Sequence, residues 1–445
     1  MTTSAAGVAL SGVASIAATK ILATTLGPAA VASLQTLQQA RQTAVIAATS
    51  NGQTALVQGA SSLEGLEGAR YVRTVACIFL IGTLLASFGL WAGPGGVLRW
   101  VLEHTGLASM GSSVLPWLGL AVALTSAYVF VTALLNSMGK VGTLAVLQAA
   151  GPAAVALLAY PVARSGGVRA IAIMVACSAG ASAGAALVAI LRYPESLRVW
   201  FFDFRGWWDV RAARHFFSIS TAMLITGFLA SAAVLAVRGN IIRSQGLQRT
   251  GLFDAAWSIS MNQVTLVLAS VQTYYLPALT KARTSADKSS EISRVLIAGT
   301  LAAALAIAGL ALAQSVVLDL LYSRAFEAAH QYLRWTLVGD YLKVSSWILS
   351  VPMLAAADMK LFLASDLAAS GTFLGAAFLL TRWFEPAESA SMAFVLMYAV
   401  HLIICLFYLR VRQGIRLDSR TTTCWVGGLA LVLAATSAGW KAAGK

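Results

Sequence analysis

The chain has 445 residues, of which 58% are hydrophobic and only 11% are charged, and its mean hydropathy is +0.77. A soluble globular protein needs a charged surface, so this composition excludes that class and predicts a protein whose solvent is the lipid bilayer. The formal net charge of +14 also suits a nucleic-acid-binding protein. The basic residues are dispersed among apolar stretches rather than clustered, however, so we expect no nucleic acid as a partner.

Apolar stretches of membrane-spanning length follow one another along the chain, and they predict an all-α polytopic protein with twelve transmembrane helices. The predicted spans lie at residues 6–26, 30–49, 74–91, 114–136, 143–162, 168–191, 218–237, 254–275, 295–317, 331–355, 361–380 and 391–408. A thirteenth helix at 424–440 is an open alternative, because that stretch is just long enough to span. The first span is expected to remain in the mature protein, since no basic residue precedes it as in a signal peptide.

The segment at residues 196–217 separates the first six predicted spans from the second six. We predict an N-terminal six-helix lobe at 1–195, a cytoplasmic interfacial linker at 196–217, a C-terminal six-helix lobe at 218–412 and a basic segment with the extra helix at 413–445. In the linker, aromatic residues alternate with charges from Trp200 to Trp208. This pattern is typical of a segment in the headgroup layer, and a surface that recognises a lipid substrate is the alternative.

The lysines and arginines between the spans set the predicted orientation. With the N-terminus in the cytoplasm, the cytoplasmic loops contain about twice as many of them as the opposite loops. The first and seventh spans are both rich in serine and alanine, and each has a cation toward its outer portion, Lys20 or Arg238. Such a repeat is expected of a transporter built from two related bundles around a central site.

The second span carries a polar stripe. Gln35, Gln38, Gln39 and Gln42 recur at helical spacing, and Arg41 adjoins them. A transmembrane helix this polar must face water or protein. Amide groups offer both donors and acceptors to sugar hydroxyls, and an arginine can bind a phosphate through two parallel hydrogen bonds. The alternative is that the amides bond to neighbouring helices.

Three cations are candidate binding residues for an anionic head group. Together, Lys20, Arg41 and Arg238 would make the space between the two halves electropositive. The alternative for Lys20 and Arg238 is that their side chains extend to the membrane surface. The predicted polar lining of the cavity consists of Gln35, Gln38 and Gln42.

Charged residues also lie inside the later spans. Asp340 and Lys343 are three residues apart, hence on one helical face, and we expect a self-neutralising pair. The pair either couples or gates transport, or it only lowers the cost of insertion or holds a neighbouring helix. Asp366 in the next span is a candidate partner for Lys343 or a proton acceptor, whereas His401 is expected to be packed and hydrogen-bonded. The four cysteines are scattered, so no metal site is predicted.

Three stretches of the chain resemble a known family. They are Leu26-Gly27-Pro28-Ala29, the run Tyr275 to Lys281 and above all Trp335 to Val344, and they resemble stretches of Wzx-type O-antigen and enterobacterial common-antigen translocases. These proteins are lipid-linked oligosaccharide flippases of the MOP superfamily, and the resemblance covers residues 6–412. The sequence differs from the family pattern in having Asp366 where a glutamate is expected.

The resemblance implies a MATE-like fold with a cavity between two six-helix lobes. It implies that the chain moves an undecaprenyl-pyrophosphate-linked oligosaccharide from the cytoplasmic to the periplasmic leaflet of the bacterial inner membrane by alternating access. It also implies coupling to H⁺ or Na⁺ without an organic cofactor, and a polysaccharide polymerase and a chain-length regulator as candidate partners.

Two other classes compete with this one. A multidrug or cation extruder of the same superfamily favours acidic cavity residues, whereas the intramembrane cations here outnumber Asp340 and Asp366. An integral-membrane polysaccharide polymerase or glycosyltransferase needs a catalytic constellation, and the longest outward loop offers only Arg99, Glu103 and His104. We therefore expect a transporter and not an enzyme.

Overall fold

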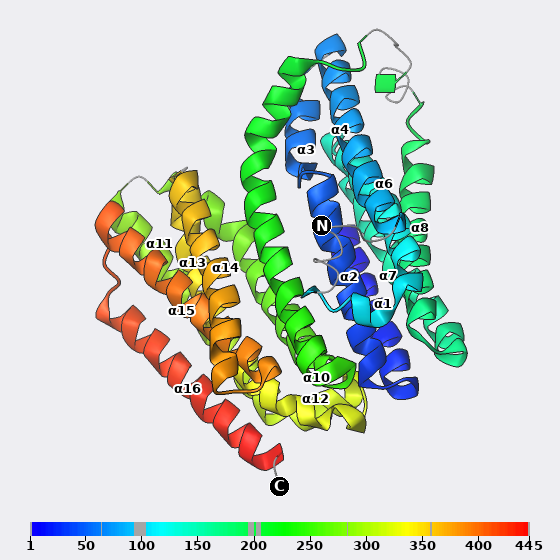
Figure 1. The fold of residues 1–445 in the computed structure, drawn as a ribbon. Coiled ribbons are helices and arrows are strands. Elements are labelled where there is room, and N and C mark those ends of the chain that lie inside the picture. Colours follow the sequence, from blue (N-terminus) through cyan, green and yellow to red (C-terminus); the bar gives the residue numbers. More distant parts are fainter. Residues whose placement is uncertain are drawn as a thin grey trace. The chain divides into compact units, whose positions relative to one another are not determined.

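The computed structural model describes residues 2–63, 65–92, 104–194, 200–201, 206–282, 284–356 and 358–443, with side chains in the same ranges except at 2–10, 141, 263, 265–274 and 277. Within these ranges the regular elements are all helices (Figure 1). Nine helices in the described part of the chain are long and apolar enough to cross a membrane. The protein is therefore all-α, as the sequence predicts.

Contacts between Cα atoms divide the chain into two compact units, Met1–Arg243 and Ser244–Lys445. The first unit contains α1 (Thr2–Thr25), α2 (Pro28–Ala48), α3 (Gln53–Ser62), α4 (Gly65–Trp91), α6 (Leu115–Ser137), α7 (Val141–Ser165), α8 (Val168–Ile190) and the first part of α10 (Val210–Lys281). The second unit contains the rest of α10, α11 (Ser285–Leu312), α12 (Gln314–Leu321), α13 (His330–Ala355), α14 (Met359–Leu379), α15 (Pro386–Arg412) and α16 (Ser419–Ala443).

Each predicted span falls mainly on one of these helices, and the ninth, 295–317, continues past the end of α11 into α12. The seventh and eighth predicted spans are the two parts of α10, which is interrupted at Gly246, where φ is +77°. Glycine has no Cβ and adopts this left-handed conformation at little cost, so the break occurs there. The stretch 424–440 lies within α16, which is 25 residues long. The helix α3 was not predicted, because it is too short to give a spanning pattern, and α12 was not predicted as an element separate from α11.

The first part of α10 belongs to the first unit because its side chains pack there. The ring of Phe216 is completely buried and lies 6.2 Å from the ring of Phe79 on α4, which in turn lies 5.7 Å from Phe130 on α6. The hydropathy pattern predicts this span in a C-terminal lobe beginning at residue 218, and the lobe boundaries stay a prediction. Within the predicted linker, residues 196–199 and 202–205 lie outside the described residues. The backbone amide of Asp209 donates to Thr74 Oγ1 on α4 at 3.1 Å.

Small residues allow close helix packing inside each unit. A Cβ added to Gly82 of α4 would collide with the carbonyl oxygen of Ala48 on α2, and one added to Gly439 of α16 would collide with the carbonyl oxygen of Ala311 on α11. In lipid, such close approach replaces hydrophobic burial as a main source of helix association.

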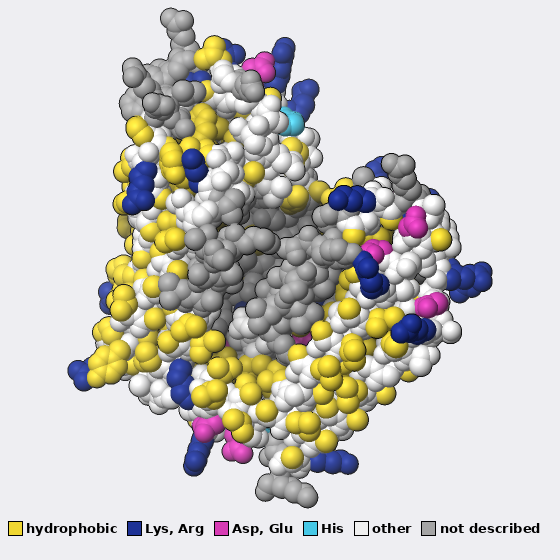
Figure 2. All heavy atoms as spheres, turned by 180° about the vertical axis from the view of Figure 1, so that it is seen from behind, with side chains coloured by type: hydrophobic (Ala, Val, Ile, Leu, Met, Phe, Trp, Pro, Cys, Tyr) yellow, Lys and Arg dark blue, Asp and Glu magenta, His cyan; other side chains and the backbone are white. Residues whose placement is uncertain are grey.

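The outer surface is apolar. Leu80, Leu84, Leu85 and Phe88 follow one face of α4 and are each more than half exposed. On the face that Figure 2 shows, hydrophobic side chains form broad patches and many lysine and arginine side chains stand at the margins. A surface of this kind is stable when lipid covers it.

Candidate functional site

In the first unit, the polar stripe of α2 is bonded to the first part of α10. Gln39 Nε2 donates to Ser231 Oγ at 2.8 Å and to the Ser231 carbonyl oxygen at 3.2 Å, and Thr43 Oγ1 lies 2.7 Å from Ser231 Oγ. About three helical turns further on, just past the end of α2, Asn51 Nδ2 donates to the carbonyl oxygen of Met223 at 2.7 Å. We call this set of contacts the α2–α10 seam, and it is the helix-to-helix bonding that the sequence analysis gave as an alternative.

Arg238 is held by the same seam. Its side chain is only 3% exposed, and Nη1 donates to Gln39 Oε1 at 3.3 Å. The side chain therefore turns inward to α2 rather than extending to the surface. Because Gln39 is a neutral acceptor, this hydrogen bond fixes the position of the guanidinium without cancelling its positive charge.

Arg41 lies on a different side of α2. It is two residues beyond Gln39, which places it about 200° around the helix, while Gln38 lies between the two directions. Arg41 is half-buried, and its Nε is buried with no hydrogen-bond partner among the residues the structure describes. A buried cationic atom without a partner is costly, so an anion supplied from outside would be favoured there.

The three amides predicted to line a cavity differ from Gln39. Gln35 and Gln38 are half-buried and Gln42 is exposed, and within the described ranges none of the three makes a side-chain hydrogen bond. Their donors and acceptors are available to another molecule. Lys20 lies half-buried on α1, and α1 packs mainly against α7. Unlike the three amides, Lys20 already interacts with another group of the protein.

In the second unit, Asp340 and Lys343 do not form the predicted direct pair. Asp340 is completely buried; its Oδ1 accepts a hydrogen bond from Ser260 Oγ at 2.7 Å, and Oδ2 has no hydrogen-bond partner in the described part of the chain. Lys343 Nζ instead lies 3.3 Å from Met261 Sδ. The two side chains do not bond directly because α10 supplies a separate partner to each, but their charges remain near enough to interact electrostatically. The self-neutralising pair stays a prediction.

Tyr398 on α15 was missed by the sequence analysis. Its side chain is 7% exposed, and the Lys343 ammonium lies 5.6 Å from its ring centroid. The Tyr398 hydroxyl interacts electrostatically with both Asp340 on α13 and Asp366 on α14. These three helices lie next to one another within the second unit (Figure 1). The tyrosine thus brings all three predicted coupling residues, Asp340, Lys343 and Asp366, into one electrostatic group.

His401 lies next to this group, about one helical turn after Tyr398 on α15. It is buried at 5% exposure, its ring lies 6.4 Å from that of Tyr398, and Nε2 lies 3.8 Å from Cys405 Sγ. The histidine is packed, as expected. No cluster of three or more histidine, cysteine, aspartate or glutamate side chains able to hold a metal ion occurs among the described residues.

No protein-family model matches the chain. Two curated proteins, the lipid III flippases of Escherichia coli (strain K12) and Shigella flexneri, are each 24% identical to it over 201 residues. The matched region is 44% of this chain and 47% of each flippase, so the chain matches about half the length of these relatives.

Solved structures show a similar fold over nearly the whole chain. The lipid II flippase MurJ in an inward closed conformation has a TM-score of 0.74 at 12% identity, covering 100% of both chains. An inward-facing MATE multidrug transporter of the MOP superfamily has a TM-score of 0.72 at 14% identity, covering 90% of this chain and 94% of the other. The MATE multidrug transporter DinF-BH has a TM-score of 0.63 at 13% identity, covering 94% and 95%.

The chain is therefore a multi-pass membrane protein with a MATE-like fold. Within that class, the proteins that it resembles are lipid flippases and transporters, and none of those named is an enzyme.

Proposed function

We propose that this protein is a flippase that moves an undecaprenyl-pyrophosphate-linked oligosaccharide, such as an O-antigen, common-antigen or exopolysaccharide repeat unit, from the cytoplasmic to the periplasmic leaflet of the bacterial inner membrane. The observation that carries the proposal is Arg41, a half-buried cation whose Nε has no partner among the described residues, on a helix rich in unbonded amides. The similarity of this protein to lipid III flippases, over 44% of the chain, supports a lipid-linked substrate.

The physical task of such a flippase matches these groups. The diphosphate and the sugar must leave water, and each unpartnered charge in hydrocarbon costs several kcal/mol or more. Arg41 is half-buried and Arg238 is buried within the first unit, and both can offer charge-assisted hydrogen bonds to phosphate oxygens. Gln35, Gln38 and Gln42 can exchange hydrogen bonds with sugar hydroxyls. Lys20 completes the proposed set.

We propose that ion coupling, which would drive transport, takes place in the second unit. Asp340, Lys343 and Asp366 form one electrostatic group around Tyr398, and a proton or Na⁺ bound there would change its net charge. We place the N-terminus in the cytoplasm, and we regard a polysaccharide polymerase and a chain-length regulator as the partners to test.

The test is genetic and biochemical. Deleting the gene is expected to make undecaprenyl-linked oligosaccharide accumulate on the cytoplasmic leaflet, and wild type is expected to reverse this. Arg41→Ala should slow translocation by about tenfold or more, as the loss of a charge-assisted bond implies. Arg164→Ala is the matched control, because Arg164 is an exposed arginine at the end of α7 in the same unit.

Normal translocation by Arg41→Ala, at wild-type levels in the membrane, would contradict the cation-binding proposal. The second candidate is a multidrug or cation extruder. It is favoured by the MATE-like fold and by buried Asp340, whose Oδ2 has no hydrogen-bond partner among the described residues. Unchanged lipid-linked oligosaccharide together with altered drug sensitivity in the deletion strain would support that function instead.

A further inference from the structure

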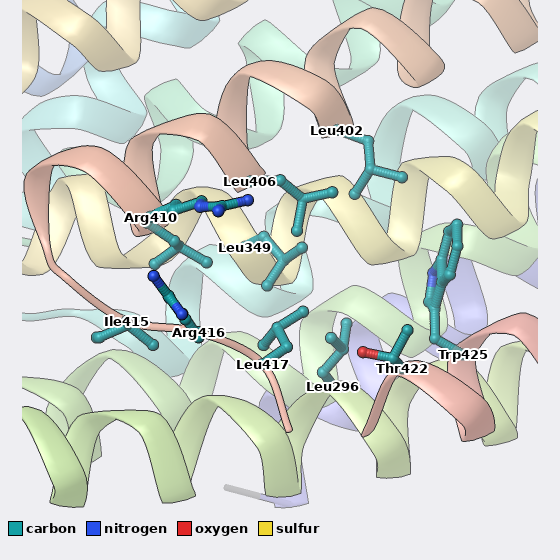
Figure 3. A pocket seen from close by; sticks show the side chains of 11 residues that line it. Leu296, Leu349, Leu402, Leu406, Arg410, Ile415, Arg416, Leu417, Thr422 and Trp425 are labelled. Carbon is teal, nitrogen blue, oxygen red and sulfur yellow. The ribbon is translucent and has the colours of Figure 1, made fainter. Parts of the chain in front are cut away.

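A pocket of about 550 Å³ opens in the second unit between α11, α13, α15 and α16 (Figure 3). Leucines from three of these helices line it, among them Leu296, Leu349 and Leu402. Two arginines also line it: Arg410 at the end of α15 and Arg416 in the following segment. Figure 3 shows both guanidinium groups at one end of the pocket, with Leu402 and Trp425 toward the other. The pocket is therefore apolar along most of its length and cationic at one end.

The two arginines have no partners within the described part of the chain. Neither Arg410 nor Arg416 takes part in an ion pair or a side-chain hydrogen bond there. The nearest acid in sequence, Asp418, is engaged elsewhere: its Oδ1 accepts a hydrogen bond from the backbone amide of Thr421 at 2.9 Å. The side chain and backbone of Thr421 hold the pKa of the Asp418 carboxyl below its usual value, and the carboxylate interacts with Arg420. An anion that binds at this end of the pocket would therefore meet two guanidinium groups that no described acidic side chain already neutralises.

The pocket has the layout of a lipid at the membrane interface. Arg410 is exposed near the end of α15 and Arg416 is exposed in the segment that follows, whereas Leu402 lies eight residues before Arg410, about 12 Å deeper along the helix. A phosphate at the arginines would therefore sit at headgroup level while an acyl chain extends along the leucines. Arginines next to the end of a transmembrane helix are also where anionic lipids are attracted in the cytoplasmic leaflet.

We propose that this pocket binds one anionic glycerophospholipid, with its phosphate between Arg410 and Arg416 and one acyl chain against Leu349, Leu402 and Leu406. The site is separate from the transport residues named above, and the proposal does not depend on the flippase function. Trp425, which lines the pocket, donates from Nε1 to Ser345 Oγ on α13 at 2.9 Å. The bound lipid would therefore strengthen the packing of α16 against the helix that carries Asp340.

Fluorescence quenching tests the proposal directly. The full-length protein is reconstituted into phosphatidylcholine bilayers that contain a minor fraction of phosphatidylglycerol, and either lipid carries brominated acyl chains. Subtracting the signal of Trp425→Phe isolates the indole that lines the pocket. Brominated phosphatidylglycerol is expected to quench Trp425 at a lower mole fraction than brominated phosphatidylcholine does.

The arginine variants supply the decisive comparison. Arg410→Ala and Arg416→Ala should each weaken the preference for phosphatidylglycerol about fivefold, and the double variant should abolish it. Arg412→Ala is the matched control, because Arg412 is exposed on the same helix but does not line the pocket, and it should keep the preference.

Three outcomes would overturn the proposal: equal quenching by the two lipids, a preference that survives in the double variant, or displacement of phosphatidylglycerol by much smaller amounts of a polyprenyl diphosphate. The last would assign the pocket to the substrate path. If Trp425→Phe fails to fold, the stabilisation of the wild type against thermal unfolding by phosphatidylglycerol, and its loss in the double arginine variant, decides the same question.

Discussion

An Asp340→Asn variant is expected to reach the membrane in normal amounts but to transport at least about tenfold more slowly than the wild type. Asparagine has nearly the same volume and keeps an oxygen for the hydrogen bond from Ser260 Oγ, now 2.7 Å from Asp340 Oδ1. It cannot carry a negative charge or take up a proton. Any coupling that depends on this carboxylate, through Lys343 and Tyr398, is therefore lost while the packing is retained. The measurement is the rate of substrate translocation in proteoliposomes.

Asp340→Ala separates stability from coupling. Alanine removes the acceptor of the Ser260 hydroxyl in a completely buried position, which should lower the free energy of unfolding by about 1.5–3 kcal/mol. The partner variant Ser260→Ala removes the same hydrogen bond but keeps the carboxylate, so it should lose stability and keep coupling. If Asp340→Asn translocates substrate at the wild-type rate while Asp340→Ala is unstable, Asp340 has only a structural role.

The sequence predicted the spans well because hydrophobic length alone specifies a transmembrane helix. It also placed a break in the chain between residues 237 and 254, where α10 is interrupted at Gly246. It did not predict that helical structure continues on both sides up to that glycine, since the polar residues there lower the hydropathy without ending the helix.

The candidate site was predicted only in part, because side-chain partners depend on tertiary contacts. The spacing of Asp340 and Lys343 correctly put them on one helical face, but it gave no sign that Ser260 and Met261 on another helix would receive them. Tyr398 was missed for a similar reason. An aromatic residue in an apolar span carries no distinguishing pattern, and its role depends on the packing of α13, α14 and α15 against one another.

For Arg238, too, the sequence does not predict the tertiary contact. The sequence identified the cation, and the structure adds its partner, Gln39, on a helix almost two hundred residues away in the chain. The seam leaves two roles open for this arginine: it can hold α10 to α2, or it can present its charge to an anionic head group. A single substitution at Gln39 distinguishes these roles, because the amide positions the guanidinium without neutralising it.

Gln39→Glu is expected to stabilise the first unit and to slow transport. A carboxylate at this position can still accept from Arg238 Nη1, now 3.3 Å from Gln39 Oε1, and a charge-assisted bond is about twice as strong as a neutral one. The glutamate loses the donor that reaches both Ser231 Oγ and the Ser231 carbonyl oxygen, so the net gain in the free energy of unfolding should be small, at most about 1 kcal/mol. The positive charge of Arg238, however, would be cancelled for any incoming diphosphate.

The opposite signs of the two effects make this variant informative. If Arg238 only joins two helices, a stronger bond should leave translocation unchanged or improve it, and that result would remove Arg238 from the binding site. If it binds the head group, translocation should fall while the temperature of unfolding does not. Ser231→Ala is the matched control, because it breaks the same seam at Gln39 and Thr43 without altering any charge. It should therefore lower stability and leave the attraction for a diphosphate intact.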